Sequence, residues 1–206
     1  MLRITMRPAA LETMALDAAV RVLREGGVVA YPTDTLYGLA VDPRNAAAIA
    51  RLFTLKGRPE TSALTLIATD VDQARQVAAF DAVAERLARR WWPGPLTIVL
   101  PAREALSREL LAGGTTVGVR VPANDVARAL ASAFDFCITA TSANRSGEPA
   151  AVTPDDVVHG VPGVDALVDA GPAPGGEPST IVRTMDAGLT LLRAGALPWD
   201  RVLESL

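Results

Sequence analysis

The sequence predicts an α/β protein built on a mixed β-sheet with flanking helices. Short apolar runs alternate with amphipathic stretches along most of the 206 residues, which is the order expected when helices connect the strands of one sheet. Near the C-terminus, two apolar runs at 179–183 and 189–193 are separated by a short connection. A short connection favours an antiparallel pair, so we expect parallel and antiparallel strands in the same sheet.

The helices are predicted from apolar residues at helical spacing and from capping residues. Residues 11–25 carry the first amphipathic pattern, and two glycines follow it. Asn45, Asp70 and Thr153 have side chains suited to N-caps, and a proline follows Thr153 at the first helical position. The predicted helices are 11–25, 46–55, one from 71, one reaching 90, 125–133, one from 154 and a short one at the C-terminus.

The strands are predicted from short apolar runs bounded by turn residues. They are 28–31, 64–68, 96–100, 116–121, 137–140, 179–183 and 189–193. The stretch 170–178 is rich in Pro and Gly and is predicted to be a surface loop, because the chain after it is too short for a second domain. We therefore expect one domain over residues 1–206.

Composition excludes several classes of protein. Lys and Arg together number 20 against 23 Asp and Glu, so the formal net charge is −3, which does not suit a protein that coats nucleic acid. Cys137 and His159 are each the single residue of their type, which excludes an intrachain disulfide and disfavours a Ser-His-Asp hydrolase. The sequence has no signal-like start and no apolar run of membrane-spanning length, so we expect a cytoplasmic protein with no membrane partner.

Two polar segments in the first third of the chain are candidate ligand sites. Y-P-T-D-T-L-Y-G-L, from residue 31, places Asp34 and Thr35 at a strand end, where α/β sheets bind ligands. The same side chains also suit bonds to their own turn. In K-G-R-P, Lys56 (the single lysine) and Arg58 suit a polyphosphate. Cations at that position also stabilise the C-terminus of a helix.

Two later segments are candidates as well. Arg120 interrupts an apolar strand, so its guanidinium lies either at the sheet edge or in a cleft, where a carboxylate ligand suits it. The run T-A-T-S-A-N-R-S-G at 139–147 opens from a strand into hydroxyl and amide side chains. It predicts either an anion-binding nest or an ordinary polar loop.

Three other features are assigned to structure. The Trp91–Trp92 pair beside two arginines resembles an aromatic, basic nucleic-acid patch, but tryptophans before a strand more often form core or cleft wall. Cys137 lies in an apolar strand and is predicted to be inert core. His159 precedes a glycine and is predicted to be the C-terminal residue of a helix.

In this order, the motifs resemble those of the YrdC-type family, the threonylcarbamoyl-AMP synthases that act in making N6-threonylcarbamoyladenosine in tRNA. The matching segments are Y-P-T-D-T-L-Y-G-L, K-G-R-P, W-P-G-P-L-T, V-G-V-R-V-P, S-A-N-R-S-G, S-T-I-V and L-L-R-A-G, over residues 26–195. The resemblance implies a YrdC-like fold, a twisted mixed sheet whose concave face is a large basic cleft. The resemblance is to the short form of the family, which has no C-terminal accessory domain.

The resemblance also implies the reaction. The family is a transferase, a nucleotidyltransferase that joins L-threonine, bicarbonate or CO2, and ATP into threonylcarbamoyl-AMP and pyrophosphate. ATP is a substrate and brings Mg2+ with it, so no metal ligand is expected from the protein. Handover to the tRNA threonylcarbamoyl transferase complex and weak RNA binding are the partner hypotheses. The alternatives are a YrdC-like paralogue of unsettled function and an RNA-binding module.

The family's functional residues carry over to positions in both halves of the chain. Lys56 and Arg58 take the catalytic role by holding the triphosphate. The implied ATP-binding residues are Lys56, Arg58, Ser62, Thr116, Ser142, Asn144 and Arg193. The implied threonine-binding residues are Thr35, Arg120, Ala140 through its backbone, and Ser179. The sequence departs from the usual family pattern at Ser62, Ile67 and Asn124–Asp125.

Overall fold

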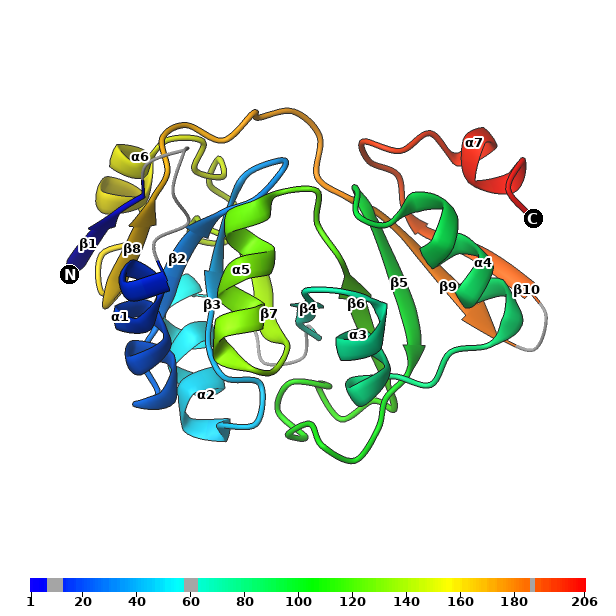
Figure 1. The fold of residues 1–206 in the computed structure, drawn as a ribbon, viewed down its shortest axis with the longest axis horizontal. Coiled ribbons are helices and arrows are strands. Elements are labelled where there is room, and N and C mark those ends of the chain that lie inside the picture. The colour runs from blue at the N-terminus through cyan, green and yellow to red at the C-terminus, as the bar shows by residue number, and fades with distance from the viewer. Residues whose placement is uncertain (7–12, 58–62, 186–187) are drawn as a thin grey trace.

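A twisted β-sheet runs through the middle of the molecule (Figure 1). The structure is a computed structural model that describes residues 1–6, 13–57, 63–185 and 188–206. The strands are β1 (Leu2–Thr5), β2 (Val29–Pro32), β3 (Tyr37–Ala40), β4 (Thr65–Ile67), β5 (Leu96–Pro101), β6 (Thr116–Arg120), β7 (Ile138–Ser142), β8 (Ala166–Asp169), β9 (Thr180–Met185) and β10 (Gly188–Arg193). The helices are α1 (Thr13–Arg24), α2 (Ala46–Lys56), α3 (Val71–Val77), α4 (Ala82–Trp91), α5 (Asp125–Phe134), α6 (Pro154–Gly160) and α7 (Trp199–Leu203).

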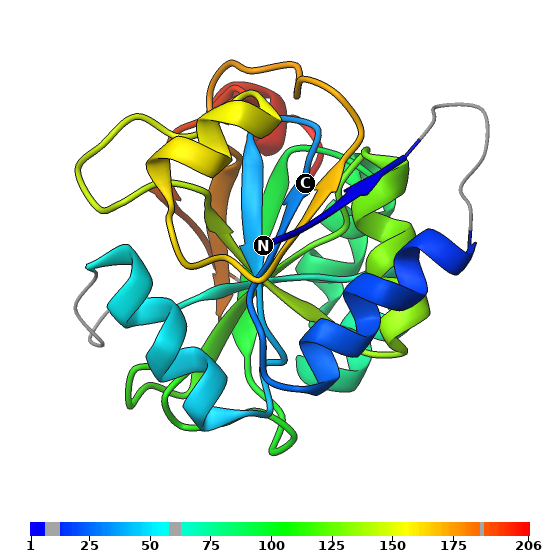
Figure 2. The same cartoon turned by 90° about the vertical axis from the view of Figure 1, so that its left-hand side faces the viewer.

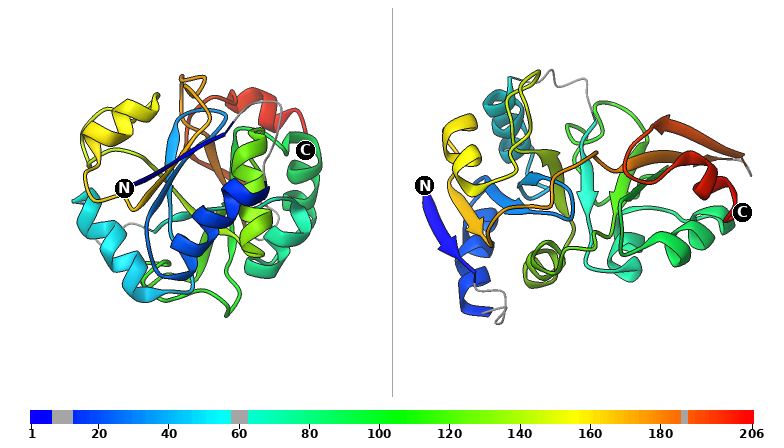
Figure 3. Two further views of the ribbon diagram at one scale, coloured as in Figure 1. Left: turned by 60° about the vertical axis from the view of Figure 1, so that its left-hand side comes forward. Right: turned by 90° about the horizontal axis from the view of Figure 1, so that it is seen from above.

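The sheet has the strand order β1-β8-β2-β3-β7-β4-β6-β5-β9-β10. Strands β4 and β6 are parallel, as are β5 and β9, whereas β5–β6 and β9–β10 are antiparallel. The prediction of a mixed sheet is confirmed. Helices α1, α3, α4, α5 and α7 lie on one side of the sheet, and α2 and α6 lie on the other (Figures 2 and 3).

Three strands, β1, β3 and β8, were not predicted. The residues from Tyr37 form β3 because the turn at 33–36 reverses the chain, so the motif that starts at Tyr31 is a β2–β3 hairpin rather than a strand and a loop. Strand β8 follows a Gly- and Pro-containing stretch and pairs in parallel with both β1 and β2. Its fully buried residues 166–168 form a short apolar run that suits a parallel strand covered on both faces.

The predicted helix caps are present. Asn45 accepts a hydrogen bond from the backbone of α2 at 3.1 Å, and Asp70 does the same for α3 at 2.8 Å. At α6, Thr153 and Asp156 form a reciprocal capping box. The first residues of the predicted helix 11–25 lie outside the described residues. Among the helices that the structure describes, none is long and apolar enough to cross a membrane.

The features assigned to structure occupy the expected places. Trp92 is nearly buried, and its indole Nε1 donates to the carbonyl of Leu96 at 2.7 Å. Cys137 is fully buried, and burial raises the pKa of its thiol to about 12, so it stays a neutral core residue. His159 lies in the last turn of α6, with its Nδ1 2.7 Å from the carbonyl oxygen of Asp155.

The register of β7, β4 and β6 directs alternate side chains to the face on which α2 and α6 lie. Thr65 pairs with Gly118 on one side and with Ala140 on the other, and Ile67 pairs with Arg120. Because side chains alternate along a strand, these positions share one face. At Gly118 a Cβ would lie 2.9 Å from the Thr65 methyl, so the glycine leaves this part of the sheet surface without a side chain. The sheet thereby forms the floor of a cavity.

Candidate functional site

A cavity of about 480 Å³ opens over this part of the sheet. Its walls come from the β2–β3 hairpin, the middle strands of the sheet and the start of β9 with the end of β10. The lining residues are Tyr31, Thr33, Thr35, Leu36, Tyr37, Gly38, Ala63, Thr65, Ile67, Thr97, Arg120, Ala140, Thr141, Ser142, Ala150, Pro178, Ser179, Ile181 and Arg193. The polar side chains of the lining carry hydroxyl groups or, at Arg120 and Arg193, guanidinium groups.

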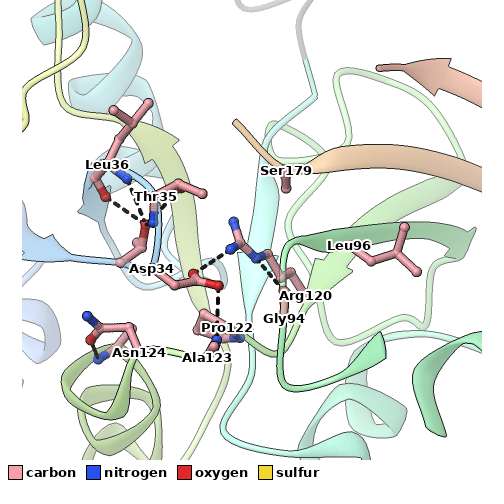
Figure 4. A network of polar contacts seen from close by, with 12 residues as sticks. Asp34, Thr35, Leu36, Gly94, Leu96, Arg120, Pro122, Ala123, Asn124 and Ser179 are labelled. Carbon is pink, nitrogen blue, oxygen red and sulfur yellow. Dashed lines mark hydrogen bonds and ion pairs between the residues drawn. The ribbon is translucent and has the colours of Figure 1, made fainter. Parts of the chain in front are cut away.

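Arg120 is buried in the cavity wall and held by two partners. Its Nε donates to the carbonyl of Gly94 at 2.9 Å, and its Nη2 pairs with the Asp34 carboxylate. The side chains of the pair are only 8% and 15% exposed. The third nitrogen, Nη1, makes no hydrogen bond to the described residues and points away from both partners (Figure 4). Of the two positions predicted for Arg120, the cleft is therefore the correct one.

The turn at 33–36 explains how Asp34 reaches Arg120. The sequence left open that Asp34 and Thr35 bond to their own turn, but Thr33 takes that role. Its Oγ1 accepts from the backbone N–H groups of Thr35 and Leu36, both at 3.2 Å. The Asp34 carboxylate therefore extends out of the hairpin, and its Oδ2 accepts from the N–H of Ala123 at 3.1 Å. Thr35 lines the cavity, and its hydroxyl also lies 3.1 Å from the Thr33 hydroxyl.

Arg193, Ser179 and Thr97 form a second polar group on the opposite wall. The Nη2 of Arg193 donates to the Ser179 carbonyl at 2.6 Å and lies 3.2 Å from its Oγ. The Ser179 hydroxyl also lies 2.8 Å from the hydroxyl of Thr97. Partial burial and the positive charge of Arg120 lower the pKa of Arg193. Two guanidinium charges thus face one cavity, which favours an anionic ligand.

Lys56 connects the end of α2 to the turn after β7. Its ammonium donates to the Ser142 carbonyl, to the Asn144 carbonyl at 2.9 Å and to the Asn144 Oδ1 at 3.2 Å. The Ser142 hydroxyl donates to the same Oδ1 at 2.5 Å. Lys56 is only 3% exposed, so it is not a solvated cation at a helix end. Ser142 is the member of this cluster that lines the cavity.

The loop after β7 uses its own donors to fix its shape. The N–H of Ala143 donates to the Tyr37 carbonyl at 2.8 Å. The Asn144 Nδ2 donates to the carbonyls of Arg145 at 2.9 Å and Glu148 at 2.6 Å. Both ends of the Asn144 amide are therefore occupied within the protein. Anion binding by this segment stays a prediction.

The two tyrosines of the lining act as fixed walls. Burial raises the pKa of Tyr31 well above its usual range, and burial together with the charge of Asp169 raises the pKa of Tyr37 to about 12. Their hydroxyls donate to the carbonyls of Thr139 at 3.0 Å and Gly171 at 2.7 Å. Both phenols remain protonated at neutral pH and are engaged in hydrogen bonds.

The structure brings together residues implied for both substrates. Those that line the cavity are Thr35, Arg120, Ala140, Ser142, Ser179 and Arg193. Lys56 and Asn144 lie behind Ser142, and Thr116 lies on β6 two residues before Gly118, outside the lining. Arg58 and Ser62 lie outside the described residues. Within the described chain, no group of three His, Cys, Asp or Glu residues could hold a metal ion.

Comparisons with known proteins agree on one family. The family model Sua5_yciO_yrdC, described as "Telomere recombination", matches residues 21–195. A threonylcarbamoyl-AMP synthase of Pyrococcus abyssi is 36% identical over 93% of this chain and 57% of its own length. One of Chromohalobacter salexigens is 40% identical over 85% of this chain and 95% of its own length.

The solved structures include crystalline P. abyssi Sua5 complexed with L-threonine, which matches with a TM-score of 0.95 at 34% identity. That match covers 100% of this chain and 61% of the P. abyssi chain, so the present chain spans little more than half of this longer relative. The family match covers most of the chain, and the folds agree. The chain belongs to the Sua5/YciO/YrdC family.

Proposed function

We propose that this chain is an L-threonylcarbamoyladenylate synthase. It joins L-threonine, bicarbonate or CO2, and ATP, releases pyrophosphate, and serves the N6-threonylcarbamoyladenosine modification of tRNA. Relatives named threonylcarbamoyl-AMP synthase support this, among them one matched over 95% of its length. The observation that carries the proposal is the cavity that Arg120 and Arg193 face, since a threonine carboxylate and a triphosphate are both anions.

The Arg120 side of the cavity suits threonine. The unoccupied end of its guanidinium can take a carboxylate, and the Thr35 and Ser179 hydroxyls lie in the same lining. Ala140 contributes backbone on the cavity floor, although its carbonyl already accepts from Thr65 Oγ1 at 2.5 Å. L-threonine is the molecule in the P. abyssi Sua5 complex, whose fold this chain shares.

The Arg193 side, together with Ser142, suits the nucleotide. In this proposal Lys56 and Asn144 bind the ATP phosphates, and Arg58, Ser62 and Thr116 contribute, as the family pattern implies. Lys56 and Asn144 also hold the loop that carries Ser142. Mg2+ arrives with ATP on its phosphate oxygens. The Asp34 carboxylate is paired with Arg120.

The reaction needs placement more than a covalent nucleophile. The threonine amine nitrogen bonds to the carbon of CO2 and loses a proton to water, which gives a carbamate. A carbamate oxygen then bonds to the α-phosphorus while the bond from that phosphorus to the oxygen of the β-phosphate breaks, and pyrophosphate leaves. Holding these groups in line and neutralising their charge is work that arginines and hydroxyls can do. It uses neither Cys137 nor His159.

The setting of the enzyme is part of the same proposal. We place it in the cytoplasm, where it hands its product to the tRNA threonylcarbamoyl transferase complex, with at most weak binding of RNA. Residues 1–206 act as one YrdC-like domain, in keeping with a single ten-stranded sheet.

Pyrophosphate release tests the proposed function. We expect release from ATP that requires both threonine and bicarbonate, with threonylcarbamoyl-AMP identified by mass spectrometry. The Arg120→Ala variant should lose most of its kcat/KM for threonine. Release that is independent of threonine would assign the chain to a paralogous activity. RNA binding without any pyrophosphate release would favour the RNA-binding alternative.

A further inference from the structure

Asp34 is a partly buried carboxylate that the proposed reaction leaves without a role. It does not line the cavity, yet it pairs with Arg120, which does. Its second oxygen accepts from the N–H of Ala123, in the loop between β6 and α5. Asp34 therefore joins three segments that lie far apart in the sequence: the β2–β3 turn, the end of β6 and the loop that follows it (Figure 4).

The two partners of Arg120 fix the plane of its guanidinium. Gly94 accepts from Nε, and Asp34 accepts from Nη2. With two of three nitrogens engaged, the planar group cannot rotate without breaking a charged hydrogen bond, and Nη1 is left facing the ligand side. A fork of this kind binds a carboxylate well only when it is held in a fixed orientation.

We propose that Asp34 is a positioning residue for recognition of the amino-acid carboxylate, acting through Arg120. This inference rests on the proposed function, because threonine is the ligand that supplies the carboxylate. Asp34 touches no substrate. It holds the guanidinium end-on to the cavity and neutralises one of the two arginine charges that share it.

The direction in which Asp34→Asn changes threonine affinity distinguishes a positioning role of Asp34 from a simple effect of its charge. Removing an anion near Arg120 leaves more positive charge in the cavity, so Coulomb attraction alone predicts tighter threonine binding by Asp34→Asn. If Asp34 instead positions Arg120, the variant should bind threonine more weakly. An amide does not hold a buried guanidinium as a carboxylate does, so the Arg120 side chain turns away from the ligand. We expect the positioning effect to dominate, with the threonine Kd raised about tenfold or more.

The experiment compares Asp34→Asn with a matched control, Asp165→Asn. Asp165 also pairs with an arginine, Arg51 at 2.6 Å, and accepts a backbone N–H, that of Val28 at 2.7 Å, but none of these residues lines the cavity. Titration calorimetry measures threonine and ATP binding separately in the full chain. Asp165→Asn should leave both affinities within about twofold, and Asp34→Asn should weaken threonine alone.

A double-mutant cycle checks that Asp34 acts through Arg120. In the Arg120→Ala background, adding Asp34→Asn should change kcat/KM for threonine by less than about twofold, because the group that it positions is gone. A purely structural loss would reduce activity again. If Asp34→Asn does not fold, Asp34→Glu keeps the charge but displaces it by a methylene, and it should weaken threonine binding with ATP binding unchanged.

Three results would overturn the inference: unchanged or tighter threonine binding in the folded variant, equal loss of threonine and ATP binding, or independent effects in the double variant. The proposed function fails differently. If the wild-type chain binds no threonine and releases no pyrophosphate, the synthase assignment falls and the role of Asp34 falls with it. If the wild type is active but Asp34→Asn behaves like Asp165→Asn, only the positioning role is wrong.

Discussion

Replacing Lys56 by methionine should destabilise the protein even without any ligand. Methionine keeps the length of the side chain but removes the ammonium. The Asn144 carbonyl then loses its described donor, whereas the Ser142 carbonyl keeps the Asn144 N–H at 3.0 Å. The Asn144 Oδ1 likewise keeps the Ser142 hydroxyl at 2.5 Å. One acceptor is thus orphaned and two others lose a charged donor.

These losses set the size of the effect. Leaving a buried acceptor unsatisfied costs about 1–3 kcal/mol, and hydrogen bonds to charged groups contribute about 1.5–3 kcal/mol each. Part of this is offset, because the variant no longer desolvates an ammonium group. We expect a net loss of about 3 kcal/mol. For a chain of this length, that corresponds to a fall in Tm of about 6–12 °C.

Urea unfolding measures this loss, and limited trypsin digestion localises it. Arg145 is exposed in the loop that Lys56 holds, so cleavage after Arg145 should be faster in Lys56→Met. The control is Arg24→Met, which removes an exposed cation from the last turn of α1. It should change stability by less than about 0.5 kcal/mol. If the two variants lose the same stability and Arg145 stays protected, Lys56 is an ordinary helix-end cation and the structural reasoning is refuted.

Three further predictions concern other parts of the molecule. Gly195→Ala should distort the cavity wall and weaken ligand binding by calorimetry, because its Cβ would lie 2.2 Å from the Pro178 carbonyl oxygen and 2.8 Å from that of Ser179; normal affinities would contradict the described backbone. The buried thiol of Cys137, with its pKa raised to about 12, should resist alkylation at pH 8 until the protein unfolds. In the unfolded chain, the Cys137 thiol ionises near its ordinary pKa of 9.0. The contribution of the buried thiol to the free energy of unfolding is therefore full below that pH and is lost as the pH rises toward 12. Urea unfolding across about pH 8–11 measures this loss. His159→Gln should keep kcat within about twofold, since among the described residues the imidazole has a hydrogen-bond contact only within its own helix; a hundredfold loss would make acid–base catalysis a candidate again.

Local sequence patterns predicted most of the helices and strands, because caps and apolar periods act within a few residues. Strands β1, β3 and β8 were missed. Strand β3 begins beside a polar turn and contains Gly38, and the short β1 and β8 gain their stability from pairing with each other across the sequence. Pairing over such distances leaves no local signal.

The candidate site shows the same division. The motifs indicated Thr35, Arg120, Ser142, Ser179 and Arg193, and the fold brings all five to one cavity.

The contacts between motifs were not predictable in the same way. Asp34 pairs with Arg120, and Lys56 donates to the Ser142 carbonyl; in each pair the two residues are 86 positions apart in the sequence. The sequence showed that Asp34 and Lys56 were polar residues at element ends. The strand order shows that both also hold other segments of the chain in place.

The loop at 170–178 carries the chain from one end of the sheet to the other, because β8 is second in the strand order and β9 is ninth (Figure 1). On the way, the N–H of Gly175 donates to the Thr35 carbonyl at 2.8 Å. The segment that follows the loop, from β9 to α7, joins the rest of the sheet through the parallel pairing of β5 with β9. A cut within this loop would therefore divide the protein into two fragments that share the cavity between them, with Thr35 and Arg120 on one and Ser179 and Arg193 on the other. Association of the two fragments would then create the binding site, so ligand binding by a protein cut at this loop would report that its fragments have associated.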